Sequence, residues 1–356
     1  MNGQTDFSID LASIEAWLVA NSVLTHGGLS EVRQLAGGTQ NIVLRFSNGG
    51  RDYVLRHPPA KPRPNSNKLL EREIRLLRAL AGSAVPHPAV LAACTDLSVA
   101  GGVFYLMEAV DGFNPTVAMP DRAASDPAIR HRMGIEMIDG LSALADVAPI
   151  DAGLGDFGKL EGFLERQVTR WATELDSYAR FDGWEGPGAL GDVAAVGQWL
   201  SDHLPPDMKP GVIHGDYHVG NCIFADDGQL NAIVDWEMAT LGDPLVDLGR
   251  LLVSWPDGGM VRPQTMRVAP LDGFPTKEEM IARYAERSGR SLDHLPWFEV
   301  LACYKLGLIL EGSHARAQAG LADMATGQRL HRSAVALLDE ARAIIAAGDN
   351  NPAGVR

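Results

Sequence analysis

The sequence predicts an α+β protein of two lobes: a small N-terminal lobe with an antiparallel sheet and a larger, mainly helical C-terminal lobe. The chain has 356 residues, which exceeds the usual size of one compact domain. Short β-prone runs separated by glycine turns occupy its first part, and apolar residues at helical spacing dominate the remainder. We therefore expect lobes at residues 1–111 and 112–356, with one cleft between them.

Bulk properties exclude several classes of protein. The chain carries 31 basic and 45 acidic residues, a net charge of −14, and a nucleic-acid surface would need clustered Lys and Arg. Residues 1–10 contain no basic region followed by an apolar core, and no apolar run approaches a membrane span. Cys94, Cys222 and Cys303 are odd in number and widely spaced, which is typical of reduced thiols. We expect a cytoplasmic protein without nucleic-acid or membrane partners.

The N-terminal lobe is predicted to begin with a helix and to continue as a three-strand meander. The helix covers residues 9–23, and the strands cover 29–35, 42–46 and 52–56. Glycine-bearing turns separate the strands, and the first of them contains Gly37, Gly38 and Thr39. A Gly-Gly pair alone usually marks only a turn, but this one precedes a strand pair that ends in a cation, Arg56.

A strongly amphipathic helix over residues 69–80 carries one charge on its apolar stripe. Glu73 lies on the same face as Leu70, Leu76 and Leu77. A carboxylate in such surroundings needs a partner, and Arg56 at the end of the third strand is the obvious one. The alternative is that Glu73 lies at the edge of the stripe in water; we favour the ion pair.

The remaining elements are a hairpin over residues 90–112 and a series of amphipathic helices. The helices are expected at residues 126–148, 160–175, 193–203, 276–287, 294–312 and 327–347, with a further one continuing through 250–254. Arg166 and Arg170 lie together on the flank of the second helix. Four residues at the end of the 294–312 segment and just beyond it are expected to be exposed and are candidates for an acceptor wall, although simple solvation explains each of them: Glu311, His314, Arg316 and Gln318.

Polar residues that suit catalysis gather in residues 212–237. Two β-prone runs, 222–224 and 232–234, are joined by Asp-Asp-Gly-Gln and predict a hairpin. The hairpin brings Asp216, Asn221 and Asp235 near one another, with His214 packed behind. Two carboxylates and an amide oxygen suit Mg²⁺, which shares its coordination shell with substrate phosphates. They do not suit zinc, and His218, four residues beyond His214, is followed by no further ligand at zinc spacing.

This segment resembles the aminoglycoside phosphotransferase-like kinases, which include choline-kinase-type enzymes. Their catalytic loop reads His-Gly-Asp-x-x-x-x-Asn and their metal strand reads Ile-x-Asp-Trp-Glu, as residues 214–221 and 233–237 do here. The match continues through residues 239–249. The resemblance implies a protein-kinase-like fold and transfer of the γ-phosphoryl group of ATP, or of GTP, to a small-molecule hydroxyl.

The resemblance also implies a role for each site residue. Asp216 would take the acceptor proton, and Asn221 and Asp235 would hold Mg²⁺. The supporting residues would be His214, Asp243 and Asp247, and the nucleotide-binding residues would be Gly37, Gly38, Thr39, Arg56, Glu73, Glu108 and Val110, the last two through their backbone. Protein kinases carry Lys where this chain has Arg56, and an Arg can still contact phosphate through its planar fork.

Two further phrases narrow the resemblance. Phe-Leu-x-Arg-Gln-Val-x-Arg-Trp at residues 163–171 and Val-Leu-Arg at residues 54–56 resemble the kinase-like domain of acyl-CoA dehydrogenase-linked proteins. A hydroxyacyl-CoA is therefore the first candidate acceptor, with Arg166 and Arg170 binding its anionic groups. An aminoglycoside or amino sugar is the second. A catalytically silent pseudokinase is the alternative of another class, and Arg56 is the one feature in its favour.

Overall fold

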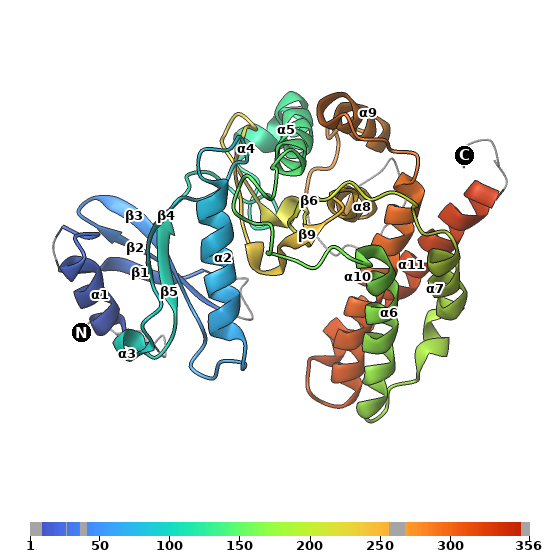
Figure 1. Cartoon of the computed structure of the whole chain (residues 1–356), viewed down its shortest axis with the longest axis horizontal. Coiled ribbons are helices and arrows are strands. Elements are labelled where there is room, and N and C mark those ends of the chain that lie inside the picture. Colours follow the sequence, from blue (N-terminus) through green and yellow to red (C-terminus); the bar gives the residue numbers. More distant parts are fainter. Residues whose placement is uncertain (1–8, 26, 36–40, 256–267, 350–356) are drawn as a thin grey trace.

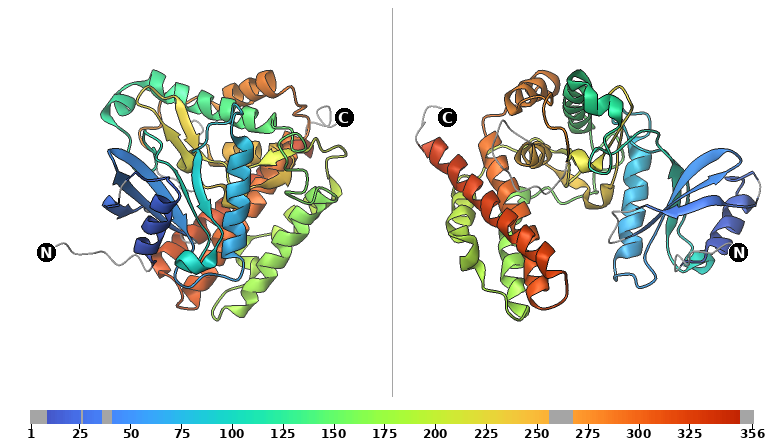
Figure 2. Two further views of the ribbon diagram at one scale, coloured as in Figure 1. Left: turned by 60° about the vertical axis from the view of Figure 1, so that its left-hand side comes forward. Right: turned by 180° about the vertical axis from the view of Figure 1, so that it is seen from behind.

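A computed structural model describes residues 9–25, 27–35, 41–255 and 268–349 (Figure 1). It contains a small lobe with an antiparallel sheet and a larger helical region, which confirms the predicted fold class. Both Figure 1 and Figure 2 show helix α2 standing between the sheet and the helical region. The division at residues 111 and 112 stays a prediction; the last strand of the sheet ends at Glu108.

The N-terminal lobe is a five-stranded antiparallel sheet in the order β1-β2-β3-β5-β4. Its elements are α1 (Leu11–Ala20), β1 (Ser30–Gln34), β2 (Ile42–Asn48), β3 (Arg51–His57), α2 (Ser66–Leu80), β4 (Val90–Cys94), α3 (Leu97–Ala100) and β5 (Phe104–Glu108). The predicted meander is confirmed as β1-β2-β3. The turn residues Gly37, Gly38 and Thr39 lie outside the described residues.

Alternation along the strands gives this sheet two apolar faces. Leu55 and Leu106 pack with Ile14 of α1 on one face, whereas Val54 and Met107 belong to the core that includes α2 on the other. Successive side chains of a strand point to opposite faces, so each central strand serves both cores. Helix α2 therefore packs against the second face of the sheet, and this packing sets the position of its charged residue, Glu73.

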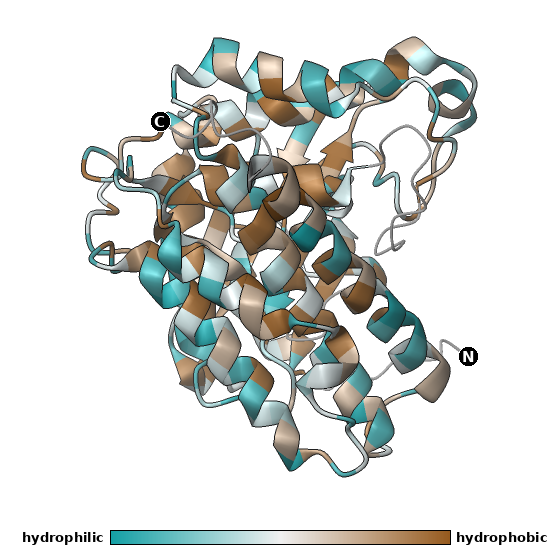
Figure 3. Cartoon of the chain, turned by 90° about the vertical axis from the view of Figure 1, so that its right-hand side faces the viewer, coloured by the Kyte–Doolittle hydropathy of each residue, from teal (hydrophilic) through white to brown (hydrophobic). Residues whose placement is uncertain are grey.

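The C-terminal region is built mainly from helices. Its elements are α4 (Asp121–Ser125), α5 (Pro127–Ala145), α6 (Phe163–Asp176), η1 (Ser177–Arg180), η2 (Pro187–Leu190), α7 (Val193–Asp202), β6 (Gly211–Ile213), η3 (Val219–Asn221), β7 (Cys222–Phe224), β8 (Leu230–Ile233), η4 (Trp236–Met238), β9 (Thr240–Gly242), α8 (Leu245–Ser254), α9 (Lys277–Ser288), α10 (Leu295–Gln318) and α11 (Met324–Asp349). In Figure 3, hydrophilic and hydrophobic residues alternate along these helices, as expected of helices with one face on a core.

Two short sheets form much of the segment at residues 212–237, where the sequence predicts the catalytic residues. The predicted hairpin is confirmed as β7 and β8, and Cys222 is a buried thiol in β7 whose pKa burial raises to about 12. The pairing of β6 with β9 was not predicted, because each strand has only three residues and β9 lies inside the loop-like motif. This second pair joins the two ends of the segment.

The expected exposure of two residues on α10 was wrong. Glu311 is 0% exposed and His314 is 5% exposed. Helix α11 packs along this face of α10, and Trp184 lies against Glu311, so the residues that periodicity alone left outside are covered by later parts of the chain. They therefore form part of the interior of the helical region.

Helix α8 packs closely on the first turn of α10 at Gly249. A Cβ atom built there would lie 2.6 Å from the carbonyl oxygen of Phe298, and that backbone cannot move aside as a flexible side chain would. The absence of a side chain thus sets how near α8 approaches α10. Both helices carry residues that hold the catalytic loop, as described below.

We expect Gly249→Ala to lower the free energy of unfolding by about 1–3 kcal/mol, because overpacking outweighs the roughly 1 kcal/mol that alanine normally adds to a helix. Denaturant unfolding measures the change. Gly348→Ala is the matched control, since a Cβ atom at that position of α11 meets nothing within 4 Å; it should be neutral or slightly stabilising. Equal stability of Gly249→Ala and the unmodified protein would contradict the packing argument.

Candidate active site

A buried carboxylate holds the backbone of the predicted catalytic loop. Asp247 on α8 is 0% exposed, and its two oxygens accept hydrogen bonds from the backbone N–H groups of His214 at 2.6 Å and Gly215 at 2.8 Å. Burial raises the pKa of Asp247, while the nearby imidazole of His214 and these two hydrogen bonds oppose the shift. Asp247 thus fixes the loop to the helix that follows it.

The carbonyl group of Gly215 is held by a lysine. Lys305 on α10 donates from Nζ to the carbonyl oxygen of Gly215 at 2.7 Å. Gly215 has a φ of +87°, and a Cβ atom there would lie 2.6 Å from the carbonyl oxygen of Met238. Only glycine fits this conformation and this close approach. The loop is therefore clamped between α8 and α10.

His214 is a buried support of the loop. Its Nδ1 accepts from the backbone N–H of Asp216 at 3.3 Å, so the proton resides on Nε2, which lies 3.0 Å from the carbonyl oxygen of Val234. The ring packs on that of Trp236, with 4.7 Å between centroids. Both nitrogens are occupied by the backbone, which favours the supporting role over that of a base.

The side chain of Asp216 extends from the clamped loop and is 39% exposed. Arg250 of α8 donates from Nε to its Oδ1 at 3.0 Å, and Nε2 of His218 lies 3.4 Å from its Oδ2. Burial would raise the pKa of Asp216, but the hydrogen bond with His218 and the charge of Arg250 outweigh it and hold that pKa well below its usual range. The group is an ionised carboxylate at neutral pH.

Asn221 and Asp235 lie at the open end of the β7–β8 hairpin. The backbone N–H of Val234 donates to the carbonyl oxygen of Asn221 at 2.9 Å, which places the two predicted ligands side by side in register. The Asn221 Nδ2 donates to the backbone oxygen of Asp216 at 3.0 Å, which leaves its Oδ1 for another partner. Asp235 has a φ of +67° and a 43% exposed side chain. A strained conformation in a residue other than glycine is common at functional sites.

Arg56 joins the two lobes. It is 5% exposed, and its Nη1 donates to Oε1 of Glu73 at 2.7 Å, so the predicted ion pair is present. Its Nη2 lies 3.3 Å from Asp235 and 3.7 Å from Glu237, both on the catalytic segment. Burial alone would lower the pKa of Arg56, but the charge of Glu73 and the other carboxylates raises it, so the guanidinium stays charged.

The other predicted residues have simpler surroundings. Asp243 is 4% exposed and accepts the N–H of Leu245 at 3.0 Å, so it caps the start of α8. The backbone N–H groups of Glu108 and Ala109 donate to Ala89 and Asp52, at 3.1 and 3.4 Å. The backbone N–H of Glu108, which was predicted to contact the nucleotide, is therefore already bound within the N-terminal lobe.

Two cations, Arg250 and Lys305, act on the carboxylate of Asp216 through their charge, and a third, Arg170, acts on Lys305. Burial lowers the pKa of Lys305 to about 8; the charges of Asp216 and Asp247 oppose the shift, and those of Arg250 and Arg170 add to it. Arg170 on α6 stacks on the Trp171 ring at 5.1 Å, and Lys305 lies 5.7 Å from the centre of the same ring. We call Arg170, Arg250 and Lys305 the cationic cluster.

Arg166 and Arg170 both lie on α6, one turn apart, but they have different partners. Arg166 donates to the backbone oxygens of Lys159 and Glu161 before α6, while Arg170 belongs to the cationic cluster. The sequence carried two usable signals for the missed members. Lys305 is the only cation between residues 295 and 310, and Arg250 lies three positions beyond Asp247 on the same helical face.

With this geometry in place, comparison with known proteins identifies the family. A model of the phosphotransferase enzyme family matches residues 31–279. The chain belongs to this family. Among solved structures, a putative aminoglycoside phosphotransferase of Ralstonia eutropha JMP134 is 29% identical with a TM-score of 0.75, covering 94% of this chain and 99% of that one. The GDP complex of aminoglycoside 2'-phosphotransferase-IIIa is 16% identical with a TM-score of 0.60, covering 93% and 98%. These likenesses confirm the predicted kinase-like fold.

The curated relatives of this phosphotransferase-family chain are longer proteins. Acyl-CoA dehydrogenase family member 11 of Gallus gallus is 32% identical over 302 residues, 81% of this chain and 37% of that protein. Member 10 of Mus musculus is 30% identical over 314 residues, 86% of this chain and 28% of that protein. Hygromycin-B 4-O-kinase of Escherichia coli is 24% identical over 249 residues, 67% and 65%. The chain thus spans less than two fifths of the acyl-CoA dehydrogenase relatives, and the predicted resemblance to that branch is confirmed. Among the described residues, no helix is long and apolar enough to cross a membrane.

Glu237 gives the site a pH-dependent contribution to stability. It follows Trp236 in the metal-strand motif and is 21% exposed. Burial, reinforced by the charge of Asp235, raises its pKa from 4.5 to about 7, while Arg56 opposes the shift. Since the folded pKa is the higher one, the stabilisation is complete below about pH 4.5 and is lost as the pH rises through about 7.

We therefore expect Glu237→Gln to become more stable than the unmodified protein as the pH is raised from about 5 to about 8. Both proteins are compared without nucleotide or metal. The gain should level off at no more than roughly 3 kcal/mol, since one unit of pKa corresponds to about 1.4 kcal/mol. Denaturant unfolding across this range measures it, with Glu165→Gln at an exposed position of α6 as the control. Parallel stability curves for Glu237→Gln and the unmodified protein would contradict the assignment.

Proposed function

We propose that this protein is a magnesium-dependent kinase that transfers the γ-phosphoryl group of ATP to a hydroxyl group of an anionic small molecule, with a hydroxyacyl-CoA as the first candidate. The observation that carries the proposal is the exposed, ionised carboxylate of Asp216, which lies beside a pair of oxygen ligands on one side and the cationic cluster on the other. Family membership supports the reaction type, and the cationic cluster supports the class of acceptor.

In the proposed mechanism, Asp216 orients the acceptor hydroxyl and accepts its proton. Hydrogen bonding to Arg250 and His218 fixes the carboxylate and lowers its pKa, so it holds the hydroxyl from the start but takes the proton late. Late transfer suits phosphoryl transfer, because its transition state is loose and little positive charge develops on the attacking hydroxyl oxygen before the new bond forms. Asp216 therefore acts chiefly through positioning.

The residues present fit a magnesium ion. The hydrogen bond of Asn221 uses its Nδ2, so its Oδ1 remains for a metal ion. The side chain of Asp235, next to it, is 43% exposed. Both are hard oxygen donors, and Mg²⁺ usually takes only one or two protein ligands and completes its shell with water and phosphate oxygens. When bound, the ion would neutralise charge on the transferred phosphoryl group.

Arg56 is suited to bind phosphate while remaining in place. Its short contact with Glu73 fixes one side of the guanidinium, whereas its contacts with Asp235 and Glu237 are longer and weaker. Its Nε is buried and has no hydrogen-bond partner among the described residues. Nε and Nη2 thus remain available as a planar fork, the geometry that matches phosphate oxygens.

The cationic cluster bears on the choice of acceptor. The charges of Arg250 and Lys305 act on Asp216, and that of Arg170 acts on Lys305, in a chain whose net charge is −14. An aminoglycoside is a polycation and would be repelled there, whereas the phosphates of a CoA thioester would be attracted. Exposed Arg170, stacked on Trp171, offers the fork that such groups bind.

Two alternatives remain distinct from this proposal. An aminoglycoside kinase is favoured by a solved relative in ternary complex with AMP-PNP and hygromycin B, the aminoglycoside phosphotransferase APH(4)-Ia, which is 17% identical with a TM-score of 0.55 and covers 90% of this chain and 98% of that one. A pseudokinase is favoured only by Arg56 in place of lysine. The ordered set His214, Asp216, Asn221 and Asp235 opposes it.

The reaction is tested by ADP release from Mg-ATP against hydroxyacyl-CoA thioesters, free hydroxy acids and aminoglycosides. Asp216→Asn should lower the acceptor-stimulated release of ADP by at least about 100-fold, the usual contribution of a positioned acid or base.

Asp235→Ala should abolish Mg²⁺-dependent nucleotide binding in titration calorimetry. Asp151→Asn, at an exposed loop position, should retain both ADP release and nucleotide binding. Stimulation by an aminoglycoside would overturn the proposed acceptor. ATP binding without stimulated turnover would favour the pseudokinase.

The acceptor class is tested at Arg170. We expect Arg170→Gln to raise the KM for the anionic acceptor about 10-fold, which corresponds to roughly 1.4 kcal/mol for one lost phosphate contact. The KM for ATP should not change. Arg180→Gln is the matched control, because Arg180 also stacks on the following aromatic residue, Phe181, at 4.8 Å. An equal effect of both changes would show that Arg170 has no specific role.

A further inference from the structure

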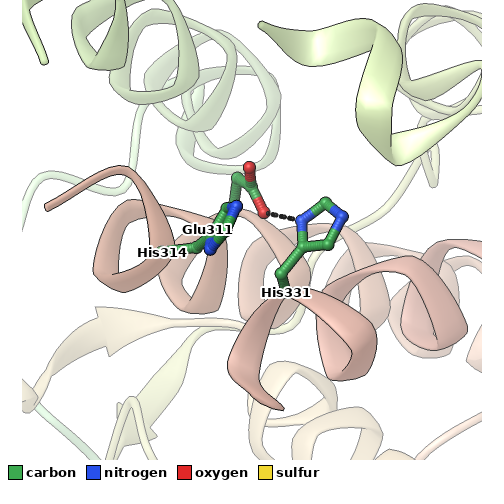
Figure 4. A group of neighbouring side chains, drawn as sticks. All are labelled: Glu311, His314 and His331. Carbon is green, nitrogen blue, oxygen red and sulfur yellow. Dashed lines mark hydrogen bonds and ion pairs between the residues drawn. The ribbon is translucent and has the colours of Figure 1, made fainter. Parts of the chain in front are cut away.

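A second cluster of metal-ligating side chains lies in the helical region, apart from the proposed magnesium site. Glu311 and His314 of α10 and His331 of α11 point toward one another, as Figure 4 shows. Each offers one ligand atom, and the three atoms lie within 4.8 Å of one another. We infer that these residues form a binding site for a divalent transition metal ion such as Zn²⁺.

The three side chains come from two helices that pack side by side. Glu311 and His314 are one turn apart on α10, and Oε2 of Glu311 lies 2.7 Å from Nδ1 of His331. The two imidazole rings face each other with 4.5 Å between centroids. A metal ion would replace the proton between Glu311 and His331, since a ligand must be deprotonated to coordinate.

His314 supplies an independent indication of a ligand. It is 5% exposed, and its Nδ1 is buried without a hydrogen-bond partner among the described residues. Its Nε2 lies 3.2 Å from the Gln318 side-chain amide. An unsatisfied buried nitrogen carries a free-energy cost. Coordination through Nδ1 would remove this cost, with the Gln318 amide turned so that its oxygen, in place of its nitrogen, faces Nε2–H and accepts from it.

Neighbouring residues already orient the ligands. Nε1–H of Trp184 donates to Oε1 of Glu311 at 2.7 Å, which holds the carboxylate and leaves Oε2 for an ion. The Gln318 amide, with its oxygen turned toward Nε2 of His314, would hold that ring in the same way. Hydrogen bonds of this kind to carboxylate and imidazole ligands are typical of protein metal sites, where they fix orientation and tautomer.

The helices leave room for this arrangement and a path to it. Gly327 of α11 faces α10, where a Cβ atom would lie 2.4 Å from Cβ of Ala317 and 3.6 Å from Nδ1 of His314. Its missing side chain lets the helices approach closely enough for His331, one turn later, to meet the other two ligands. The His331 side chain is 22% exposed, so an ion can enter from its side.

The donor set selects the class of ion. Two imidazoles and one carboxylate suit Zn²⁺, Co²⁺ or Ni²⁺, whereas Mg²⁺ prefers oxygen ligands alone. Three protein ligands leave one position for water. The site is distinct from the catalytic loop because, at about 100° per residue, Glu311 and His314 lie roughly 240° and 180° around α10 from Lys305. A bound ion would join α10 to α11 and, through Trp184, to the segment after η1.

The test is a titration of metal-free full-length protein with Co²⁺, followed by its visible absorption, with competition by Zn²⁺. We expect one equivalent of Co²⁺ with bands typical of nitrogen and oxygen ligands, displaced by Zn²⁺. His331→Gln, which keeps a polar group beside Glu311, should weaken binding at least about 100-fold, more than loss of an outer-shell partner does. Zn²⁺ should raise the Tm of the unmodified protein but not of His331→Gln.

Two controls make the result decisive. Asp235→Asn should retain this Co²⁺ equivalent, because it alters only the proposed magnesium site. His203→Gln should also retain it, since His203 is an exposed histidine of the same helical region that stacks on Trp199. Absence of Co²⁺ binding, its loss in Asp235→Asn, or unchanged binding in His331→Gln would each overturn the inference and leave Glu311 and His331 as a hydrogen-bonded buried pair.

Discussion

The candidate active site depends on one buried carboxylate. Asp247 is removed from water, and both of its oxygens are satisfied by the N–H groups of His214 and Gly215. Burying a charge without such partners would cost far more than the fold could tolerate, so the loop and α8 require each other. Gly249 then brings α8 against α10, and Lys305 of α10 holds the other edge of the loop. A chain of contacts between two helices therefore sets the direction in which Asp216 points.

A second buried charge links the sheet to this frame. Arg56 leaves β3, is fixed by Glu73 of α2, and extends to Asp235 and Glu237 of the catalytic segment. The β7–β8 hairpin supplies Asn221 in register with Val234, next to Asp235. The N-terminal sheet and the catalytic segment thus meet at one group of alternating charges. Relative movement of the lobes must alter the longer contacts of Arg56 before the short one with Glu73.

Much of this arrangement could be predicted from the sequence, because it is encoded locally. The apolar stripe around Glu73 predicts its buried ion pair from a few neighbouring residues. The short turn between residues 224 and 230 likewise predicts the hairpin. The missed features depend on distant packing. The burial of Glu311 requires α11 and Trp184, and Lys305 acquires its role only because α10 crosses the loop at Gly215. The β6–β9 pairing joins three-residue strands that carry too little alternation to be recognised. The roles of the site residues themselves stay predictions.

The cationic cluster has a consequence for how ligands arrive. The protein as a whole is strongly anionic, with a net charge of −14, while Arg170, Arg250 and Lys305 are confined to one small region. An anion that approaches this region is repelled at long range and attracted only within the last several ångströms. Salt at physiological ionic strength screens interactions beyond about 8 Å and shorter ones much less. Moderate ionic strength therefore favours encounter with an anion, the reverse of the usual slowing seen when a protein steers its ligand by opposite net charge.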